Sequence, residues 1–167
     1  MIKKLLMFVA AVIMLLSGVL NVAEAANFPA FSTKTIDGQV VTNSVFSGHK
    51  LTMINIWATW CPPCVGEMPD LGKLGRNMPN DTQLIGLLLD AKTTDEINVA
   101  KSILSKAKAN FLQMLPSKEM TPFLNSFDYI PTTVFVDSHG RIIGDLISGA
   151  CTESKYRSSI EAALKKL

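Results

Sequence analysis

Residues 54–69 read INIWATWCPPCVGEMP and place two cysteines, Cys61 and Cys64, at the junction of two different patterns. The residues before the pair are apolar and strand-like, whereas the residues after it are compatible with a helix. Pro62 and Pro63 fit the first turn of that helix, where a missing backbone N–H group costs nothing. Such a pair can bind a metal, form a permanent disulfide or act as a redox couple.

The position of the pair at a helix N-terminus favours redox chemistry. Unpaired N–H groups and the positive end of the helix dipole stabilise an anion, so we expect a thiolate at Cys61 to be favoured. Cys61 lies at the first turn and is expected to face solvent, whereas Cys64 is expected to point back beneath it. This arrangement predicts that Cys61 attacks a substrate disulfide and that Cys64 resolves the mixed disulfide.

The other uses of the pair have weaker support. Zinc needs four ligands, and beyond the pair the chain offers only Cys151, His49 and His139, both histidines in turn-like segments. Thiolates suit Cu(I), but no third copper ligand has a convincing place. A purely structural disulfide would close too short a loop to gain much entropy. We therefore predict no metal site. We interpret the remaining cysteine, Cys151, as a small buried free thiol, and the alternative is that Cys151 is a third redox-active or intermolecular thiol.

The rest of the chain predicts a single mixed α/β domain. Its expected strands are a hairpin about Asp37-Gly38, a central strand at 51–58, and strands at 82–90, 111–115, 132–137 and 142–148. One expected helix begins at the cysteines, a second begins at the capping box Thr93-Thr94-Asp95-Glu96, and a short third helix spans 119–127. The closing helix has an apolar face of Tyr156, Ile160, Ala163, Leu164 and Leu167. This order predicts one mixed sheet covered by helices on both sides, with an N-terminal β-hairpin.

Residues 1–25 predict a secretory signal peptide. Lys3 and Lys4 precede an apolar run at 5–20, and residues 23–25 read AEA, which fits the cleavage pattern. The alternative is an uncleaved anchor that tethers the protein to the membrane. The chain has a net charge of +2, and the leader carries two lysines and one glutamate, so the domain at 26–167 is near +1. A charge so close to neutral argues against nucleic-acid binding, and the leader predicts export to the periplasm or the extracytoplasmic face of the membrane.

These motifs together resemble the thioredoxin superfamily, and more narrowly its exported reductases of the TlpA/ResA type. The resemblance rests on WCPPC at 60–64, on the preceding NIWAT and on YIPTTVFVD at 129–137, and it runs from Phe28 to the end of the chain. It implies a thioredoxin-like fold in which the Ile130–Pro131 bond is cis and lies against the cysteine pair. The resemblance also implies a substrate-contacting surface made of Trp60, Pro62, Pro63, Ile130 and Pro131.

The resemblance assigns a further role to Glu67, three residues after Cys64. Cytoplasmic thioredoxins carry a buried aspartate six residues before the first cysteine, and here Asn55 occupies that place. An amide cannot titrate, so Asn55 cannot shuttle protons. The resemblance therefore makes Glu67 the proton acceptor for Cys64, and the alternative is a solvated carboxylate on the helix surface.

The sequence thus predicts an exported thiol–disulfide oxidoreductase that reduces protein disulfides with the Cys61–Cys64 redox couple and no cofactor. Oxidases of the superfamily often place a histidine between the cysteines, and its absence favours the reducing direction. The alternatives are a copper or apocytochrome chaperone of the same fold, as in c-type cytochrome biogenesis, and a disulfide-forming oxidase. The expected partners are oxidised protein substrates and a membrane electron donor that restores the dithiol.

Overall fold

The computed structural model describes residues 26–167, and the predicted signal peptide lies outside them. Within that range, no helix has both the length and the apolar character needed to cross a membrane. The described chain begins with an antiparallel hairpin of β1 (Ser32–Lys34) and β2 (Val40–Thr42). Gly38 in its turn has a φ of +83°, a left-handed conformation that glycine adopts without strain. The N-terminal hairpin predicted from Asp37-Gly38 is confirmed.

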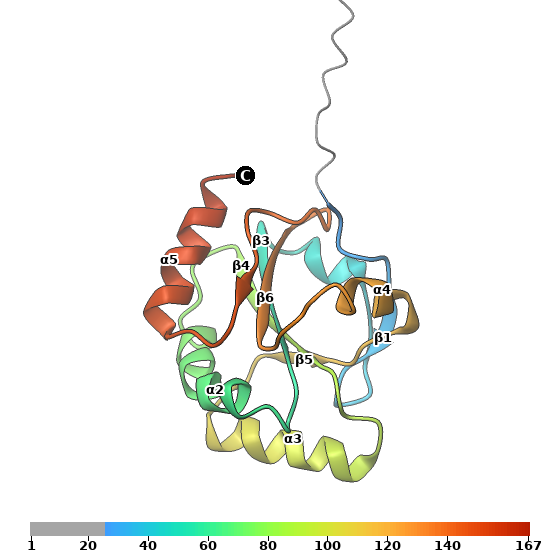
Figure 1. Ribbon diagram of the computed structural model, residues 1–167. Helices are drawn as coiled ribbons and strands as arrows, with labels where there is room; N and C mark the ends of the chain where they lie inside the picture. Colours follow the sequence, from blue (N-terminus) through green and yellow to red (C-terminus); the bar gives the residue numbers. More distant parts are fainter. Residues whose placement is uncertain (1–25) are drawn as a thin grey trace, which may run out of the picture.

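A five-stranded mixed sheet in the order β5-β4-β3-β6-β7 forms the centre of the molecule (Figure 1). Strand β3 pairs in parallel with β4 and antiparallel with β6, and β5 extends the sheet in parallel beyond β4. The strands are β3 (Leu51–Trp57), β4 (Thr82–Leu88), β5 (Leu112–Met114), β6 (Thr132–Asp137) and β7 (Ile147–Ser148). Every residue of β3 and of β6 is buried, which explains why both strands consist of apolar or β-branched residues except at Asn55 and Asp137.

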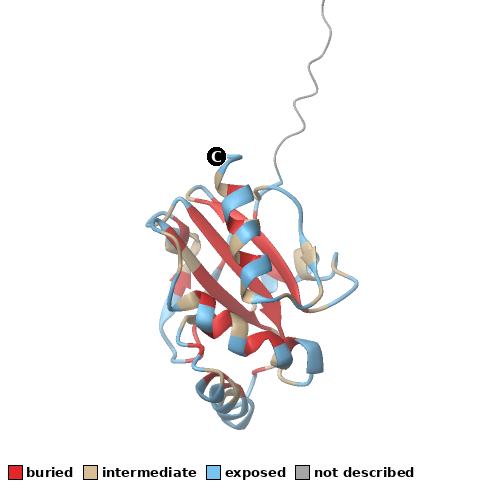
Figure 2. Ribbon diagram, turned by 90° about the vertical axis from the view of Figure 1, so that its left-hand side faces the viewer, coloured by how far each residue is buried: buried red, intermediate tan, exposed pale blue. Residues whose placement is uncertain are grey.

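The longer helices pack on one face of this sheet. Figure 2 shows α5 lying across the buried strands. These helices are α2 (Pro62–Gly75), α3 (Thr94–Lys106) and α5 (Glu153–Leu164), and they share one apolar core with β3, β4 and β6. Helix α3 begins with the predicted capping box, because the Thr93 side chain accepts from the Glu96 N–H and the Glu96 carboxylate accepts from the Thr93 N–H.

Short helices and the N-terminal segment cover the opposite face. They are the 3₁₀ helices η1 (Asn43–Phe46) and η2 (Lys118–Met120) and the short helix α4 (Thr121–Leu124). Phe28 makes edge-to-face contacts with Phe31, Phe46 and Phe123 at ring-centre distances of 5.1–5.8 Å. The predicted thioredoxin-like architecture, a mixed sheet with helices on both faces, is confirmed.

Three local expectations were wrong. The segment 142–148 is not one strand. Ile142 forms an isolated bridge with Val136 of β6, Gly144 then has a φ of +73°, and only Ile147–Ser148 forms a strand, β7. The helix predicted at 119–127 ends at Leu124, where the Ser126 hydroxyl donates to the Phe123 carbonyl at 2.7 Å and offers the backbone another partner. Leu167 lies beyond the end of α5 and is exposed.

Candidate functional site

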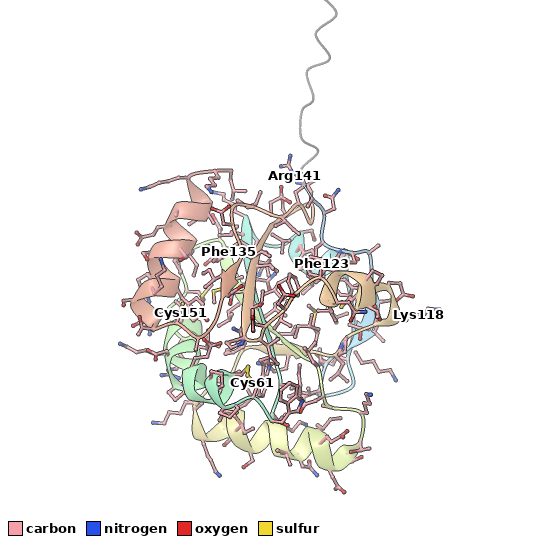
Figure 3. The ribbon with its side chains drawn as sticks, viewed as in Figure 1. Cys61, Lys118, Phe123, Phe135, Arg141 and Cys151 are labelled. Carbon is pink, nitrogen blue, oxygen red and sulfur yellow. A yellow bond between two sulfur atoms is a disulfide. The ribbon has the colours of Figure 1, made fainter. Side chains whose placement is uncertain are left out.

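The two cysteines form a disulfide at the start of α2, below the lower ends of the central strands in Figure 3. Cys61 is the N-cap residue, and Pro62 and Pro63 occupy the next two positions. Because neither proline has an N–H group, the first free backbone donor of the helix belongs to Cys64, and it lies 3.3 Å from Cys61 Sγ. In the reduced protein this N–H group and the helix dipole favour a thiolate at Cys61.

Cys61 is less accessible than its position in the sequence predicts. Only 3% of Cys61 is exposed, and Cys64 is completely buried. In the disulfide form, Cys61 Sγ is bonded to Cys64 and lies 3.6 Å from the carbonyl oxygen of Ile130. The expected order, with Cys61 nearer to solvent than Cys64, is present, but a freely exposed Cys61 is not.

Two exposed aromatic side chains belong to the two segments that meet at the disulfide. Trp60 precedes Cys61 and is 69% exposed, and Tyr129 precedes Ile130 and is 72% exposed. The peptide bond between Ile130 and Pro131 is cis. Since the Ile130 carbonyl lies beside Cys61 Sγ, the two aromatic residues stand on neighbouring segments that meet at the disulfide.

Asp90 fixes the loop that leads into the disulfide. Its carboxylate accepts from the Thr59 backbone N–H at 3.0 and 3.1 Å and from the Thr59 hydroxyl at 2.5 Å. Asp90 closely follows β4, so the parallel neighbour of β3 holds the turn that presents Trp60 and Cys61. The sequence offered no signal for this contact, because it depends on the pairing of two strands.

Glu67 lies three residues after Cys64 on α2 and is only 3% exposed, so it is not a solvated carboxylate on the helix surface. Three donors surround it. The Asn55 Nδ2 donates to Glu67 Oε1 at 2.8 Å, and the Tyr156 hydroxyl and the Cys151 backbone N–H donate to Oε2 at 2.6 and 2.9 Å. These donors come from β3, from α5 and from the loop before α5, which meet at the second turn of α2.

Burial raises the pKa of Glu67 above its usual value, and the donated hydrogen bonds from Tyr156, Cys151 and Asn55 oppose that rise. A carboxylate of this kind binds a proton more readily than an ordinary surface glutamate does. It lies three residues from Cys64 on the same helix, so it is suited to general base chemistry at that thiol.

Tyr156 and Cys151 contribute to the Glu67 site in ways that the sequence did not indicate. Tyr156 was expected only as part of the apolar face of the closing helix, yet its hydroxyl is buried against the carboxylate. The one signal in the sequence was that a buried tyrosine hydroxyl usually needs a partner. Cys151 is half-buried and outside the disulfide, and burial followed by the nearby Glu67 raises the pKa of its thiol. Within residues 26–167, no three His, Cys, Asp or Glu side chains are arranged to hold a metal ion.

Comparisons with known proteins identify the family of this chain. Residues 23–164 match the model of the Redoxin family. The chain belongs to the Redoxin family. It is 24% identical over 137 residues to the thiol-disulfide oxidoreductase ResA of Bacillus subtilis, a match that covers 80% of this chain and 72% of ResA. It is 27% identical over 141 residues to the thiol:disulfide interchange protein DsbE of Pseudomonas fluorescens biotype C, with 84% and 75% of the two chains covered.

The solved structures agree on the fold. A thiol:disulfide interchange protein of the thioredoxin family from Chlorobium tepidum superimposes with a TM-score of 0.69 at 22% identity, over 84% of this chain and 97% of that chain. Together these findings confirm the predicted resemblance to ResA-like proteins of the thioredoxin superfamily and the predicted enzyme class, thiol–disulfide oxidoreductase.

Proposed function

We propose that this Redoxin-family protein is an extracytoplasmic reductase of protein disulfides. The observation that carries the proposal is the disulfide at the N-terminus of α2 with the buried Glu67 carboxylate three residues further along the helix. A permanent structural disulfide has no use for a proton acceptor beneath it. A redox couple that opens and closes needs one, because a buried thiol must lose a proton each time it attacks.

The reaction takes place in two exchange steps that transfer two electrons. The Cys61 thiolate attacks a substrate disulfide, forms a mixed disulfide and releases one substrate thiolate. Cys64 then loses its proton to Glu67 and attacks Cys61 Sγ, which forms the Cys61–Cys64 disulfide and releases the second substrate thiolate. The substrate disulfide is reduced and the protein dithiol is oxidised.

The exposed aromatic residues provide the contact with protein substrates. Trp60 and Tyr129 offer rigid apolar area beside the disulfide, and aromatic side chains of this kind are enriched at protein interfaces. Pro62 and Pro63 are also exposed and extend this surface on the helix side. The backbone at Ile130 and Pro131 lies on the other side of Cys61, where a bound substrate chain can pair with it.

The reducing direction rests on the residues between the cysteines. Pro62 and Pro63 carry no charge and donate no hydrogen bond, so they add nothing to the stability of the reduced form that a histidine would provide. We expect a potential nearer to the thioredoxin value of about −270 mV than to the DsbA value of about −120 mV. The predicted leader at 1–25 supports an exported location, and an exported reductase needs a membrane partner that supplies electrons.

Substrate trapping in the native compartment tests the proposal. Cys64→Ser, in a chain that also carries Cys151→Ser, should accumulate mixed disulfides with oxidised proteins because resolution is blocked. The matched Cys61→Ser, Cys151→Ser chain should trap none. In parallel, the wild-type protein with a regenerating dithiol should reduce insulin over many turnovers. Stoichiometric binding without turnover would overturn the reductase and favour a chaperone, and a potential near that of DsbA would favour an oxidase.

A further inference from the structure

A second buried polar residue, Gln113, lies on the same face of the sheet as the Glu67 site. Gln113 is on β5 and is 3% exposed. The Trp57 Nε1–H donates to Gln113 Oε1 at 2.9 Å. An indole N–H can only donate, so the carbonyl end of the Gln113 amide must face Trp57 and the NH₂ end must point elsewhere. Gln113 Nε2 is buried and has no hydrogen-bond partner among the described residues.

Asn55 is oriented by the same kind of reasoning. Its Nδ2 donates to Glu67 Oε1 at 2.8 Å and to Thr133 Oγ1 at 3.2 Å. Thr133 is the direct neighbour of Asn55 on β6, so the NH₂ end of the amide faces the β6 side of β3. The carbonyl oxygen therefore faces the β4 side. Asn55 Oδ1 is also buried without a partner among residues 26–167.

Gly86 brings these two unpartnered atoms toward each other. In the sheet register, Asn55 on β3 pairs with Gly86 on β4, and Gly86 pairs with Gln113 on β5. A Cβ atom at Gly86 would overlap Gln113 Oε1 and would lie 2.7 Å from Gln113 Nε2, so the Gln113 amide lies directly over the glycine. An unpartnered donor on Gln113 thus stands opposite an unpartnered acceptor on Asn55, across a residue with no side chain.

We propose that one ordered water molecule bridges Gln113 Nε2 and Asn55 Oδ1, and that Gln113 is thereby a positioning residue for the Glu67 carboxylate. A buried donor or acceptor without a partner destabilises the folded protein, because it has lost its hydrogen bonds to water. Ordered water commonly satisfies such groups inside proteins, usually through two to four hydrogen bonds.

With the bridging water, every hydrogen bond in the network is donated toward Glu67. Trp57 donates to Gln113, Gln113 donates to the water, the water donates to Asn55, and Asn55 donates to Glu67. Each link polarises the next, and the line of donors ends on the carboxylate, where it stabilises the ionised form. Without Gln113, the Asn55 amide can turn over and accept a hydrogen bond from protonated Glu67. Gln113 therefore prevents Glu67 from holding its proton too tightly to release it.

A titration of Glu67 in the oxidised protein tests this role directly. The Cys61–Cys64 disulfide does not titrate, and the other ionisable groups near Glu67 are Asp70 on α2, Tyr156 on α5 and the Cys151 thiol. Gln113→Met keeps the length of the side chain and removes both of its polar atoms. We expect the pKa of Glu67, followed by the carbon-13 shift of its carboxyl group, to rise by about half a pH unit or more.

Gln83→Met is the matched control. Gln83 is a half-buried amide on β4 that donates to the Val45 carbonyl and to Thr52 Oγ1, and it makes no contact with the Glu67 network. Its replacement should leave the pKa of Glu67 unchanged. An unchanged pKa in a folded Gln113→Met protein would overturn the proposal. A crystal structure of the wild type at atomic resolution gives an independent test, since a gap without water between Gln113 and Asn55 would also overturn it.

This inference rests on the proposed role of Glu67, and a kinetic experiment separates the two. In the wild-type background, Gln113→Met should move the pH profile of mixed-disulfide resolution upward by the same shift as the titration. In the Glu67→Gln background it should leave that profile unchanged. If Glu67→Gln alone resolves mixed disulfides at the wild-type rate, the role of Glu67 as proton acceptor fails. The titration still decides whether Gln113 positions the carboxylate.

Discussion

The Tyr156 hydroxyl offers the most direct way to change the proton affinity of Glu67 without removing the carboxylate. It donates to Glu67 Oε2 at 2.6 Å and is completely buried. Burial and the adjacent carboxylate raise the pKa of Tyr156, so the hydroxyl stays protonated and remains a donor at every working pH. We predict that Tyr156→Phe raises the pKa of Glu67.

The size of this shift follows from the kind of hydrogen bond that is lost. A hydrogen bond to a charged group contributes about 1.5–3 kcal/mol. If the bond is lost only from the ionised form, the pKa of Glu67 rises by about one to two units. The hydrogen bonds from Asn55 Nδ2 and from the Cys151 N–H remain, so the ionised carboxylate keeps part of its stabilisation. The expected shift is therefore nearer to one unit than to two.

The assay is the carbon-13 titration of the Glu67 carboxyl group in the oxidised protein. Tyr129→Phe is a matched control, because Tyr129 and Tyr156 are the two tyrosines of the chain and Tyr129 is largely exposed. The control should leave the pKa of Glu67 where it is. If Tyr156→Phe folds and the pKa of Glu67 stays the same or falls, the hydroxyl does not stabilise the carboxylate and the reasoning about its partners is refuted.

Four further changes test the site and its support. Because the pKa of Glu67 is raised in the folded protein, its contribution to the free energy of unfolding is full below the usual value of 4.5 and is lost as the pH rises through the folded pKa. Glu67→Gln should therefore remove this fall in the free energy of unfolding with pH, measured by urea unfolding at each pH. Asn55→Asp in the Glu67→Gln background should restore part of the rate of mixed-disulfide resolution in stopped-flow measurements. If the rate does not recover, a carboxyl group on β3 cannot replace the one on α2. Gly86→Ala should destabilise the fold by about 1–3 kcal/mol, because its Cβ would overlap Gln113. Gly66→Ala, in open space on α2, should stabilise it by about 0.5–1 kcal/mol, and the same unfolding curves measure both.

The strands that carry the site were predictable because they are buried on both faces. Strands β3 and β6 have no exposed residue, so their sequences are mostly apolar and β-branched, and only Asn55 and Asp137 depart from that pattern. The start of α2 was predictable for a different reason, since Pro62 and Pro63 after an apolar run indicate a helix N-terminus. The broken segment at 142–148 was not predictable in the same way. Its apolar residues fit a strand, and only the left-handed backbone at Gly144 shows that it leaves the sheet.

The partners of the site residues could not be read from the sequence. Glu67 is on α2, whereas its donors come from β3, from α5 and from the loop before α5. Tyr156 followed the apolar periodicity of its helix, and that periodicity says which face is buried but not what the hydroxyl meets. Gln113 joins the network only through the sheet register and through the missing side chain of Gly86. These contacts depend on tertiary packing, so no local pattern marks them.

Under the proposed role of Glu67, the acid of the site stands on α2 instead of on β3, and an amide at Asn55 is compatible with disulfide exchange. In this chain Asn55 on β3 provides a donor and Glu67 on α2 provides the carboxyl group, and the two side chains share a hydrogen bond of 2.8 Å. In a chain that carries both Asn55→Asp and Glu67→Gln, the amide on α2 would donate to the carboxylate on β3. The carbonyl oxygen of that amide would still accept from the Tyr156 hydroxyl and from the Cys151 N–H, so these hydrogen bonds of the site would be conserved. If Glu67 is the proton acceptor, we expect the resolution step to require one titratable oxygen near Cys64 with donors around it, and an aspartate before the cysteines is only one way to provide it.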